Sequence, residues 1–278
     1  MNPVNRSDSF AGPITEVRAA STAGGGTALS TTAVLVPLWM GTEHVGVIVR
    51  NFATAVVAKI AVNPYLLILR SDNGLQTYTD YSAQGQQSGG TGISAGALDT
   101  LINGGQFYIG SHLPFRALQV TMSGSVNAVV ATLLGEYWNG SAWVSLAVTD
   151  GTASGGATLA QTGNITWTVP TAWAKAFPGS TLQMPVDVSQ QHQMPYADKQ
   201  RYWTRWSVSA KLTTTVTINL MLPFNRNTTH YGEAVQDSLT QLRTIKGLDG
   251  ASCIELLTDA GTANAIVNCY ISSPYGAF

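Results

Sequence analysis

The fold of this chain is decided by a stretch in its middle, which reads Glu136-Tyr137-Trp138-Asn139-Gly140-Ser141-Ala142-Trp143-Val144. An Asn-Gly pair between two aromatic, apolar arms predicts a β-hairpin, because both central residues of a type I′ turn need positive φ. With Asn139 and Gly140 as the turn, Trp138 should lie opposite Ser141. Alternation along the strands should then place Trp138 and Trp143 on one face. So much aromatic surface on adjacent strands predicts the wall of a β-sandwich or barrel.

The composition is unusual in its charge. Only 10% of the 278 residues are charged and the net charge is -1, whereas soluble domains average roughly 25% charged residues. Soluble monomers normally keep their net charge away from zero. Two explanations are possible: a subunit that neighbouring molecules largely cover, or a neutral protein that is soluble alone. The composition favours the covered subunit.

The same composition disfavours several classes of partner. The 14 Lys and Arg residues are scattered along the chain, so capture of nucleic-acid phosphates is not expected. The longest apolar run, 55–62, contains Lys59 and is far shorter than the roughly 18–20 residues of a membrane helix. The amino terminus lacks the basic and apolar pattern of a signal peptide. We therefore expect neither nucleic-acid binding nor membrane insertion nor secretion.

Short β-branched runs separated by Gly, Pro and Asn predict an all-β fold, a β-sandwich or jelly-roll-like architecture with two β-rich regions, long loops and little helix. We expect an extended N-terminal arm at 1–30, a β-rich region at 31–105, a β-sandwich module at 106–232 and a C-terminal helix/strand segment at 233–278 packing on that sandwich. The strands are expected at 33–39, 45–49, 55–62, 65–69, 115–122, 128–138, 143–148, 164–169, 202–208, 214–222, 253–257 and 266–271.

Helical signals are few. Val235, Leu239 and Leu242 have near-helical spacing, which predicts a short helix within 233–246, and 97–102 and 171–175 are expected to form single helical turns. A match between Ala55-Val56-Val57-Ala58 and Ala128-Val129-Val130-Ala131 is better explained by coincidence than by two related sandwiches.

The order of motifs in the second half supports a sharper expectation. Besides the hairpin, these motifs are Pro114-Phe115-Arg116, Thr149-Asp150-Gly151-Thr152, the glycine-rich run 155–163, the run 165–175 with two tryptophans, and Arg201-Tyr202-Trp203-Thr204-Arg205-Trp206-Ser207-Val208-Ser209-Ala210. Together they resemble a β-sandwich module of tailed-bacteriophage virion proteins, both head-decoration and tail-associated. The resemblance covers about residues 106–222, and its motifs describe strands and turns rather than chemistry.

The resemblance implies a virion location, reached by assembly in the bacterial host cytoplasm. It implies the major capsid protein or other virion proteins as partners, with homo-oligomers expected, and it carries over no active residue. The insertion 177–199 is longer than expected for the module. This loop, the arm 1–30 and the loop 82–96 are therefore the expected docking parts.

Candidate catalytic groups in the sequence are weak. Gly92-Ile93-Ser94-Ala95-Gly96 matches the pattern of a hydrolase nucleophile elbow, which needs a strand before Ser94 and a helix after it. Here the pattern lies in a glycine- and serine-rich loop, which favours a simple turn. Carboxylate pairs for glycoside cleavage would have to come from Glu136, Asp150, Asp187 and Asp198, and the sequence gives no separation between them.

Metal and phosphate sites have no better support. No histidine has a metal-ligand partner at i+2 or i+4, and the four are dispersed: His44, His112, His192 and His230. Asp72-Asn73-Gly74 and Asp150-Gly151 are more typical of turns than of calcium sites. Gly24-Gly25-Gly26 lacks the Lys and helix of a phosphate loop. Cys253 and Cys269 are expected to be buried apolar residues rather than a disulfide framework.

These observations predict a non-enzymatic virion structural protein, in first place a capsid decoration or cement subunit that bridges capsid proteins. No catalytic, cofactor-binding or metal-binding residue is assigned, and no cofactor is expected. A tail or baseplate component is the second hypothesis. A carbohydrate-binding adhesin module that stacks sugars on Trp138, Trp143 or Trp203 is the third, and a hydrolase using Ser94 is the fourth.

Overall fold

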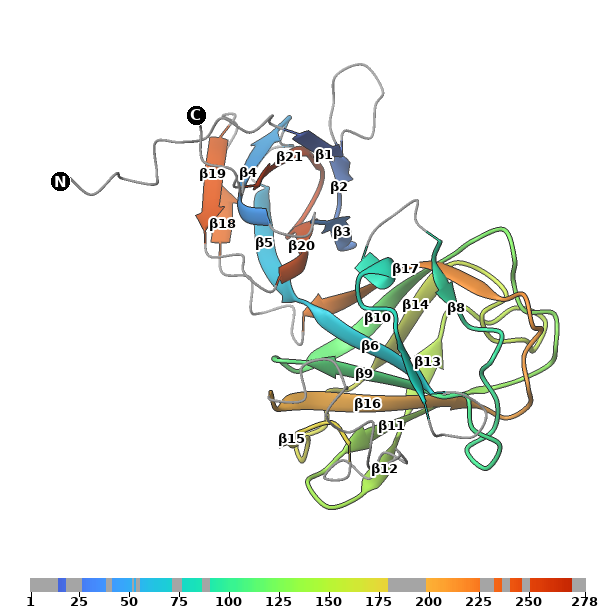
Figure 1. Cartoon of the computed structure of the whole chain (residues 1–278). Coiled ribbons are helices and arrows are strands. Elements are labelled where there is room, and N and C mark those ends of the chain that lie inside the picture. The colour runs from blue at the N-terminus through green and yellow to red at the C-terminus, as the bar shows by residue number, and fades with distance from the viewer. Residues whose placement is uncertain are drawn as a thin grey trace, which may run out of the picture. The chain divides into compact units, whose positions relative to one another are not determined.

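A computed structural model of the chain describes residues 15–18, 27–38, 42–51, 53, 56–71, 77–86, 91–179, 199–225, 233–236, 241–246 and 251–271. The fold is all-β and sandwich-like, as expected, with strands paired in antiparallel sheets (Figure 1). Within these ranges the one helical element is a 3-10 turn, η2 (Gln84–Gln86). The chain divides into two units, unit 1 with Met1–Asn63 and His230–Phe278, and unit 2 with Pro64–Thr229.

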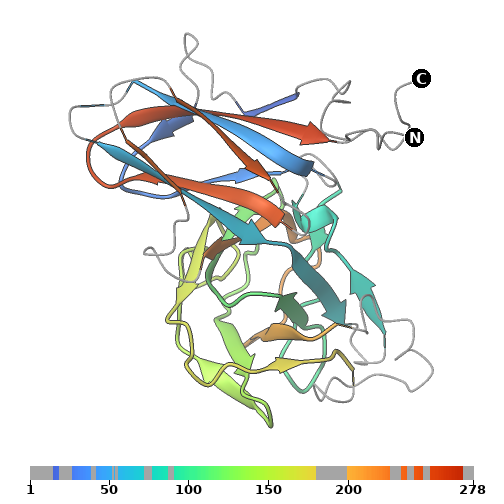
Figure 2. The same ribbon diagram turned by 90° about the vertical axis from the view of Figure 1, so that its left-hand side faces the viewer.

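Unit 1 is built from two sheets. The first has the order β1-β21-β4-β19, with β2 also pairing with β21, and the second has the order β18-β5-β20-β3. Their bounds are β1 Thr15–Arg18, β2 Thr27–Leu29, β3 Val34–Pro37, β4 Thr42–Arg50, β5 Val57–Pro64, β18 Glu233–Gln236, β19 Gln241–Lys246, β20 Ala251–Thr258 and β21 Ala263–Ile271. Figure 2 shows these two layers face to face. Alternate residues of β4 (Val45, Val47 and Val49) and of β20 (Ile254 and Leu256) form the core between them.

Unit 1 differs from the expected organisation in two ways. The described strands within 233–278 belong to unit 1, where they pair with β1 to β5. The helix expected within 233–246 is wrong: 233–236 and 241–246 are strands on the open edges of β5 and β4. Tertiary pairing has overridden the local spacing of Val235 and Leu242. Within the arm 1–30, β1 and β2 are integral strands that pair with β21.

Unit 2 is a second two-sheet arrangement. A seven-stranded sheet has the order β12-β11-β16-β9-β6-β7, with β15 also pairing with β16, and its partner sheet has the order β13-β14-β10-β17-β8. Their bounds are β6 Leu66–Ser71, β7 Tyr78–Asp80, β8 Ile93–Ser94, β9 Phe107–Ser111, β10 Phe115–Met122, β11 Leu133–Trp138, β12 Trp143–Leu146, β13 Val148–Asp150, β14 Gly163–Trp167, β15 Lys175–Ala176, β16 Arg201–Val208 and β17 Thr217–Asn225. Only Ala147 separates β12 from β13, so one stretch of chain joins the two sheets along one side.

The seven-stranded sheet carries an apolar cluster on each of its two faces. On β16, Trp206 and Val208 enter the core between the sheets, whereas Trp203 belongs to a second cluster on the outer face. This division of faces follows from the period of two with which side chains alternate along a strand. Glycine makes room for the large rings, because a Cβ at Gly135 would lie 2.7 Å from the Trp206 ring and one at Gly110 would lie 2.9 Å from the Trp203 ring. Such glycine–aromatic pairs across strands are a known device for pinning register.

The hairpin at 136–144 forms, but its turn is longer than expected. Trp138 pairs directly with Trp143, so the loop holds the four residues 139–142 rather than two. Gly140 has positive φ, at 104°, and Asn139 does not. The Asn139 side chain closes the loop instead, because its Oδ1 accepts hydrogen bonds from the backbone N–H groups of Ser141 (2.9 Å) and Ala142 (2.8 Å). The type I′ turn is therefore wrong, whereas the shared face of the two tryptophans is confirmed.

Some other segments differ more than slightly from expectation. Strand β11 begins at Leu133 rather than 128, so 128–131 is loop and does not match the start of β5. Strand β17 continues through Pro223. It can do so because β8 pairs with β17 only at Thr217 and Ile218, which leaves that side of Pro223 as an edge among the described strands. The segments 97–102 and 171–175 form turns rather than helical turns.

Candidate interaction surfaces of unit 2

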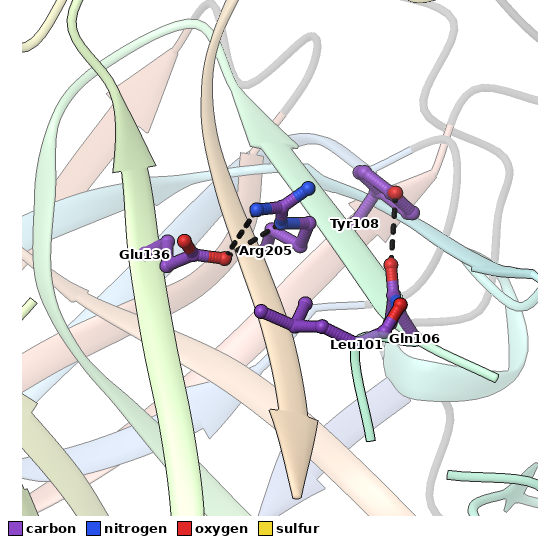
Figure 3. A network of polar contacts seen from close by, with 5 residues as sticks. All are labelled: Leu101, Gln106, Tyr108, Glu136 and Arg205. Carbon is purple, nitrogen blue, oxygen red and sulfur yellow. Dashed lines mark hydrogen bonds and ion pairs between the residues drawn. The ribbon is translucent and has the colours of Figure 1, made fainter. Parts of the chain in front are cut away.

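A row of polar and aromatic side chains crosses the outer face of the seven-stranded sheet. Strand register places Glu136 of β11 opposite Arg205 of β16, and Arg205 opposite Tyr108 of β9. Arg205 donates to Oε2 of Glu136 from Nε at 2.7 Å and lies 2.6 Å from it through Nη2 (Figure 3). The Arg205 guanidinium also lies 4.8 Å from the centroid of the Trp143 ring. The row is thus an ion pair that an aromatic ring holds in place.

Tyr108 links this row of side chains to a turn at one end of unit 2. Burial raises the pKa of Tyr108, and the nearby Arg205 charge lowers it in part, so the phenol stays protonated at neutral pH. Its hydroxyl donates to Oε1 of Gln106 at 3.0 Å, and Nε2 of Gln106 donates to the Leu101 carbonyl at 3.0 Å (Figure 3). The outer face is thereby connected to the turn that carries Leu101 and Ile102.

That turn is braced from within. Oδ1 of Asp99 accepts hydrogen bonds from the Thr100 N–H at 2.7 Å and from Nδ2 of Asn103 at 3.4 Å. The Asn103 N–H donates to the Thr100 carbonyl at 3.2 Å. Despite this order, the Ile102 side chain is 93% exposed. Leu101 beside it is 37% exposed, and exposed apolar side chains mark interaction sites where they lie together rather than singly.

A second braced loop, 123–132, is organised by Asn127, which is only 2% exposed. Its Nδ2 donates to the carbonyls of Val129 (2.8 Å) and Thr158 (2.9 Å). Its Oδ1 accepts from the Val129 N–H (3.0 Å) and from the N–H and hydroxyl of Thr213, both at 3.2 Å. One buried amide therefore joins three loops, yet Val130 in the same loop is 73% exposed.

These loops meet at one end of unit 2. The Ser209 N–H donates to the Thr132 carbonyl at 3.0 Å, and the Leu212 N–H donates to the Leu98 carbonyl at 3.2 Å. We name this region the apolar end, defined by the exposed side chains of Leu101, Ile102, Val126, Val129 and Val130. Its loops are fixed before any partner arrives, so binding there would require little further ordering.

The tryptophans proposed as a sugar platform are mostly covered. Trp138 is 3% exposed and Trp203 is fully buried. The Trp203 indole donates through Nε1 to the Ala176 carbonyl at 2.9 Å. Trp143 is half-buried and contacts Trp138 edge-on, with ring centroids 5.6 Å apart. Of the three, only Trp143 retains a surface that a sugar ring could contact.

Ser94 does not lie in a nucleophile elbow. It ends the two-residue strand β8, pairs with Thr217 and is followed by a turn rather than a helix. Its carbonyl accepts a hydrogen bond from Nη1 of Arg70 at 2.9 Å. The catalytic interpretation of Ser94 has no strand–turn–helix context here.

The candidate carboxylates have separate structural partners. Glu136 binds Arg205, as described above. Oδ1 of Asp150 accepts from the N–H (2.8 Å) and hydroxyl (2.6 Å) of Thr152, and its Oδ2 accepts from the Thr158 hydroxyl at 2.6 Å. Asp150-Gly151 is thus a turn, as expected. The remaining candidates lie outside the described residues, namely Asp187, Asp198, His192, His230, Asp72-Asn73-Gly74, Gly24-Gly25-Gly26 and the side chains of His44 and Cys269.

The described residues also offer little support for a cysteine nucleophile or a metal site. Cys253 is buried in β20, and burial raises the pKa of its thiol to about 12, so it is a small apolar residue rather than a nucleophile. Among the described residues no group of three or more His, Cys, Asp or Glu could hold a metal ion. In the same ranges no helix has the length and apolar character needed to cross a membrane.

The residues that build the apolar end were missed by the sequence analysis. The run Val126-Asn127-Ala128-Val129-Val130 has the composition of a strand, and the strand expected at 128–138 includes part of it. The available signal was Asn127, a poor strand residue inside an apolar run. Asp99 and Gln106 gave no comparable signal.

The fold therefore defines an all-β protein of two sandwich-like units. No protein-family model, no curated protein and no solved structure matches the chain.

Proposed function

We propose that the chain is a non-enzymatic structural protein of a tailed-bacteriophage virion, where it decorates the capsid and cements neighbouring capsid proteins. The motif order between 106 and 222 supports the phage setting through its resemblance to virion β-sandwich modules. The apolar end carries the proposed docking role. Its partners are the major capsid protein or other virion proteins, together with further copies of this chain.

Ile102 and Val130 are the two most exposed aliphatic side chains of the apolar end. Burying one such side chain fully is worth roughly 1.5–3 kcal/mol. The loops under both residues are already ordered, so little of that energy is spent on ordering. With a net charge of -1, copies repel one another little, and many modest contacts on one shell add through avidity.

Copy number in purified virions is the first test. Quantitative mass spectrometry should find hundreds of copies of a decoration subunit per particle. About three to twelve copies, the number expected for a ring of low cyclic symmetry, would place the chain in the tail or baseplate. Absence from the particle would reject the proposal.

The apolar end is tested by the double variant Ile102→Ser, Val130→Ser. We expect its incorporation into particles to fall about tenfold or more, because each 1.4 kcal/mol of lost contact weakens binding tenfold. Its urea unfolding should match the unaltered protein, since both side chains are exposed. Leu134→Ser is the control, because Leu134 is 43% exposed on the face of β11 rather than in these loops. Equal incorporation of all three proteins would remove the apolar end from the proposal.

A carbohydrate-binding module is the second candidate, because half-buried Trp143 lies beside the Arg205–Glu136 pair. An aromatic ring next to hydrogen-bonding groups is suited to a sugar. If this candidate holds, soluble host polysaccharide should be retained by the protein and Trp143→Ala should abolish the retention.

A further inference from the structure

A group of cations gathers at the end of the seven-stranded sheet opposite the apolar end. Lys175 belongs to β15, Arg201 begins β16, Lys199 precedes it by two residues, and His112 follows β9 directly. Register brings them together, because Ala176 pairs with Arg201 and Tyr202 pairs with Ser111. We name this group the basic end, defined by His112, Lys175, Lys199 and Arg201. Three of the 14 Lys and Arg residues therefore meet at one place in a chain that has few.

The basic end is held in place by packing. Arg201 is only 3% exposed, and its Nη1 donates to the Lys199 carbonyl at 3.3 Å. A Cβ at Gly110 would lie 3.0 Å from Cδ of Arg201, so the glycine leaves room for the arginine stem. Nζ of Lys175 lies 5.1 Å from the centroid of the Tyr202 ring. A buried guanidinium thus positions the segment from which Lys199 projects.

The four groups share one electrostatic environment. The pKa of His112 is lowered, first by partial burial and then by the positive charges of Arg201, Lys175 and Lys199. None of the described carboxylates contributes to this shift. His112, Lys175 and Lys199 are nevertheless exposed, so an approaching anion meets several cations at once.

Apolar side chains lie next to these cations in the sequence. Leu113, beside His112, is 50% exposed, and Phe177, two residues after Lys175, is 37% exposed. A nucleic acid presents a regular row of phosphates and is bound by an extended basic track. Protein interfaces instead combine apolar side chains with a charged rim. The mixture at the basic end fits a protein better than a nucleic acid.

We propose that the basic end is a docking surface for a patch of carboxylates and apolar side chains on a protein partner. The partner's identity as a virion neighbour rests on the proposed function. The surface itself rests only on the residues above. Because its charges are exposed, it should speed association and respond to salt more than it fixes the final affinity.

The test uses the full chain and a labelled peptide of alternating Glu and Leu, followed by fluorescence anisotropy. We expect the peptide to bind at least tenfold more tightly than its Gln–Leu counterpart at about 50 mM salt, and to weaken at about 200 mM as screening increases. Lys175→Glu with Lys199→Glu should lose at least tenfold in affinity. Lys211→Glu, an exposed lysine in the loop 209–216 at the other end, should bind as the unaltered protein does.

Three results would overturn the proposal: equal binding of the neutral peptide, tighter binding of double-stranded DNA than of the acidic peptide, or no effect of the double charge reversal. If the double reversal does not fold, Lys175→Gln with Lys199→Gln replaces it, with an expected loss of at least threefold. Copy number in virions is a separate measurement. Peptide binding without virion copies would reject the proposed function alone, and virion copies without peptide binding would reject the docking surface alone.

Discussion

The two ends of unit 2 are built on opposite principles. At the apolar end, neutral amides are buried and aliphatic side chains are exposed: Asn127 and Gln106 hold the loops from which Val130 and Ile102 project. At the basic end, a guanidinium is buried and cations are exposed, with Arg201 holding the segment of Lys199. In each case a buried polar group makes the surface rigid, but the chemistry offered to a partner differs.

This difference has a consequence for assembly. Apolar contacts are insensitive to salt at moderate concentrations, whereas exposed charges are screened over about 8–10 Å at physiological ionic strength. If both ends dock, raising the salt should weaken only the contact at the basic end. Since the ends lie on opposite sides of one sandwich, a single copy could contact two different neighbours.

The largest expected effect is on the free energy of unfolding, when the buried Asn127 side chain that joins the loops of the apolar end is removed. Asn127→Ala removes five side-chain hydrogen bonds at a buried site. We expect a loss of about 3–5 kcal/mol in the free energy of unfolding, because buried partners are left unpaired. Urea unfolding followed by tryptophan fluorescence measures it, because six tryptophans lie in unit 2 and only Trp39 lies in unit 1.

The control for this variant is Asn139→Ala. The Asn139 side chain closes an exposed loop rather than a buried junction, so a cost of only about 1 kcal/mol is expected. Equal costs at the two sites would mean that the junction of loops at the apolar end is not braced by Asn127.

An effect of intermediate size on the free energy of unfolding is expected when a glycine at either end is replaced by alanine. It tests how tightly each end is packed rather than how it is hydrogen-bonded. Gly110→Ala places a Cβ 2.9 Å from the Trp203 ring and 3.0 Å from the Arg201 stem, which should cost about 1–3 kcal/mol through overpacking. At the apolar end, a Cβ on Gly124 meets nothing within 4 Å, so Gly124→Ala should be neutral or stabilise by up to about 1 kcal/mol. The same urea unfolding measures both, and a harmless Gly110→Ala would show that the arginine stem is not confined.

The smallest effect concerns pH and the basic end alone. Because the pKa of His112 is lowered in the folded state, the unfolded chain binds its proton first as the pH falls. The folded state therefore loses stability below the ordinary histidine pKa of about 6.5. Lys175→Gln removes one of the repelling charges and should make the urea midpoint less dependent on pH between about 7 and 5. An unchanged dependence would mean that Lys175 does not act on His112.

The sequence predicted the strands of unit 2 better than its loops. The strand expected at 202–208 forms, and Trp206 and Trp203 lie on its opposite faces, because side-chain direction in a strand is a local property. The hairpin at 136–144 was placed correctly, but its loop length was wrong because the Asn139 side chain, rather than left-handed backbone, closes it. The strand expected at 128–138 includes Val129 and Val130, which instead lie in a loop that Asn127 joins to Thr158 and Thr213 by hydrogen bonds.

The candidate site was less predictable for the same reason. Trp138 and Trp203 are residues of the type that stacks on sugars. Whether such a ring is exposed depends on what packs over it. Here both rings belong to the outer-face cluster, which also contains Ala176 and against which Ala174 packs. The basic end combines residues far apart in sequence, from His112 to Arg201, which only strand register brings together.

The all-β class, the position of most strands and the sharing of a face by particular side chains could be inferred from the sequence, because they follow from periodicity and turn residues within a few positions. The three-dimensional fold was needed to show that 233–236 and 241–246 form edge strands of unit 1 and that valines in the loop 123–132 are exposed at one end of unit 2. Both outcomes depend on which distant backbone groups are free to pair, and that information is spread over the whole chain rather than held in any one segment.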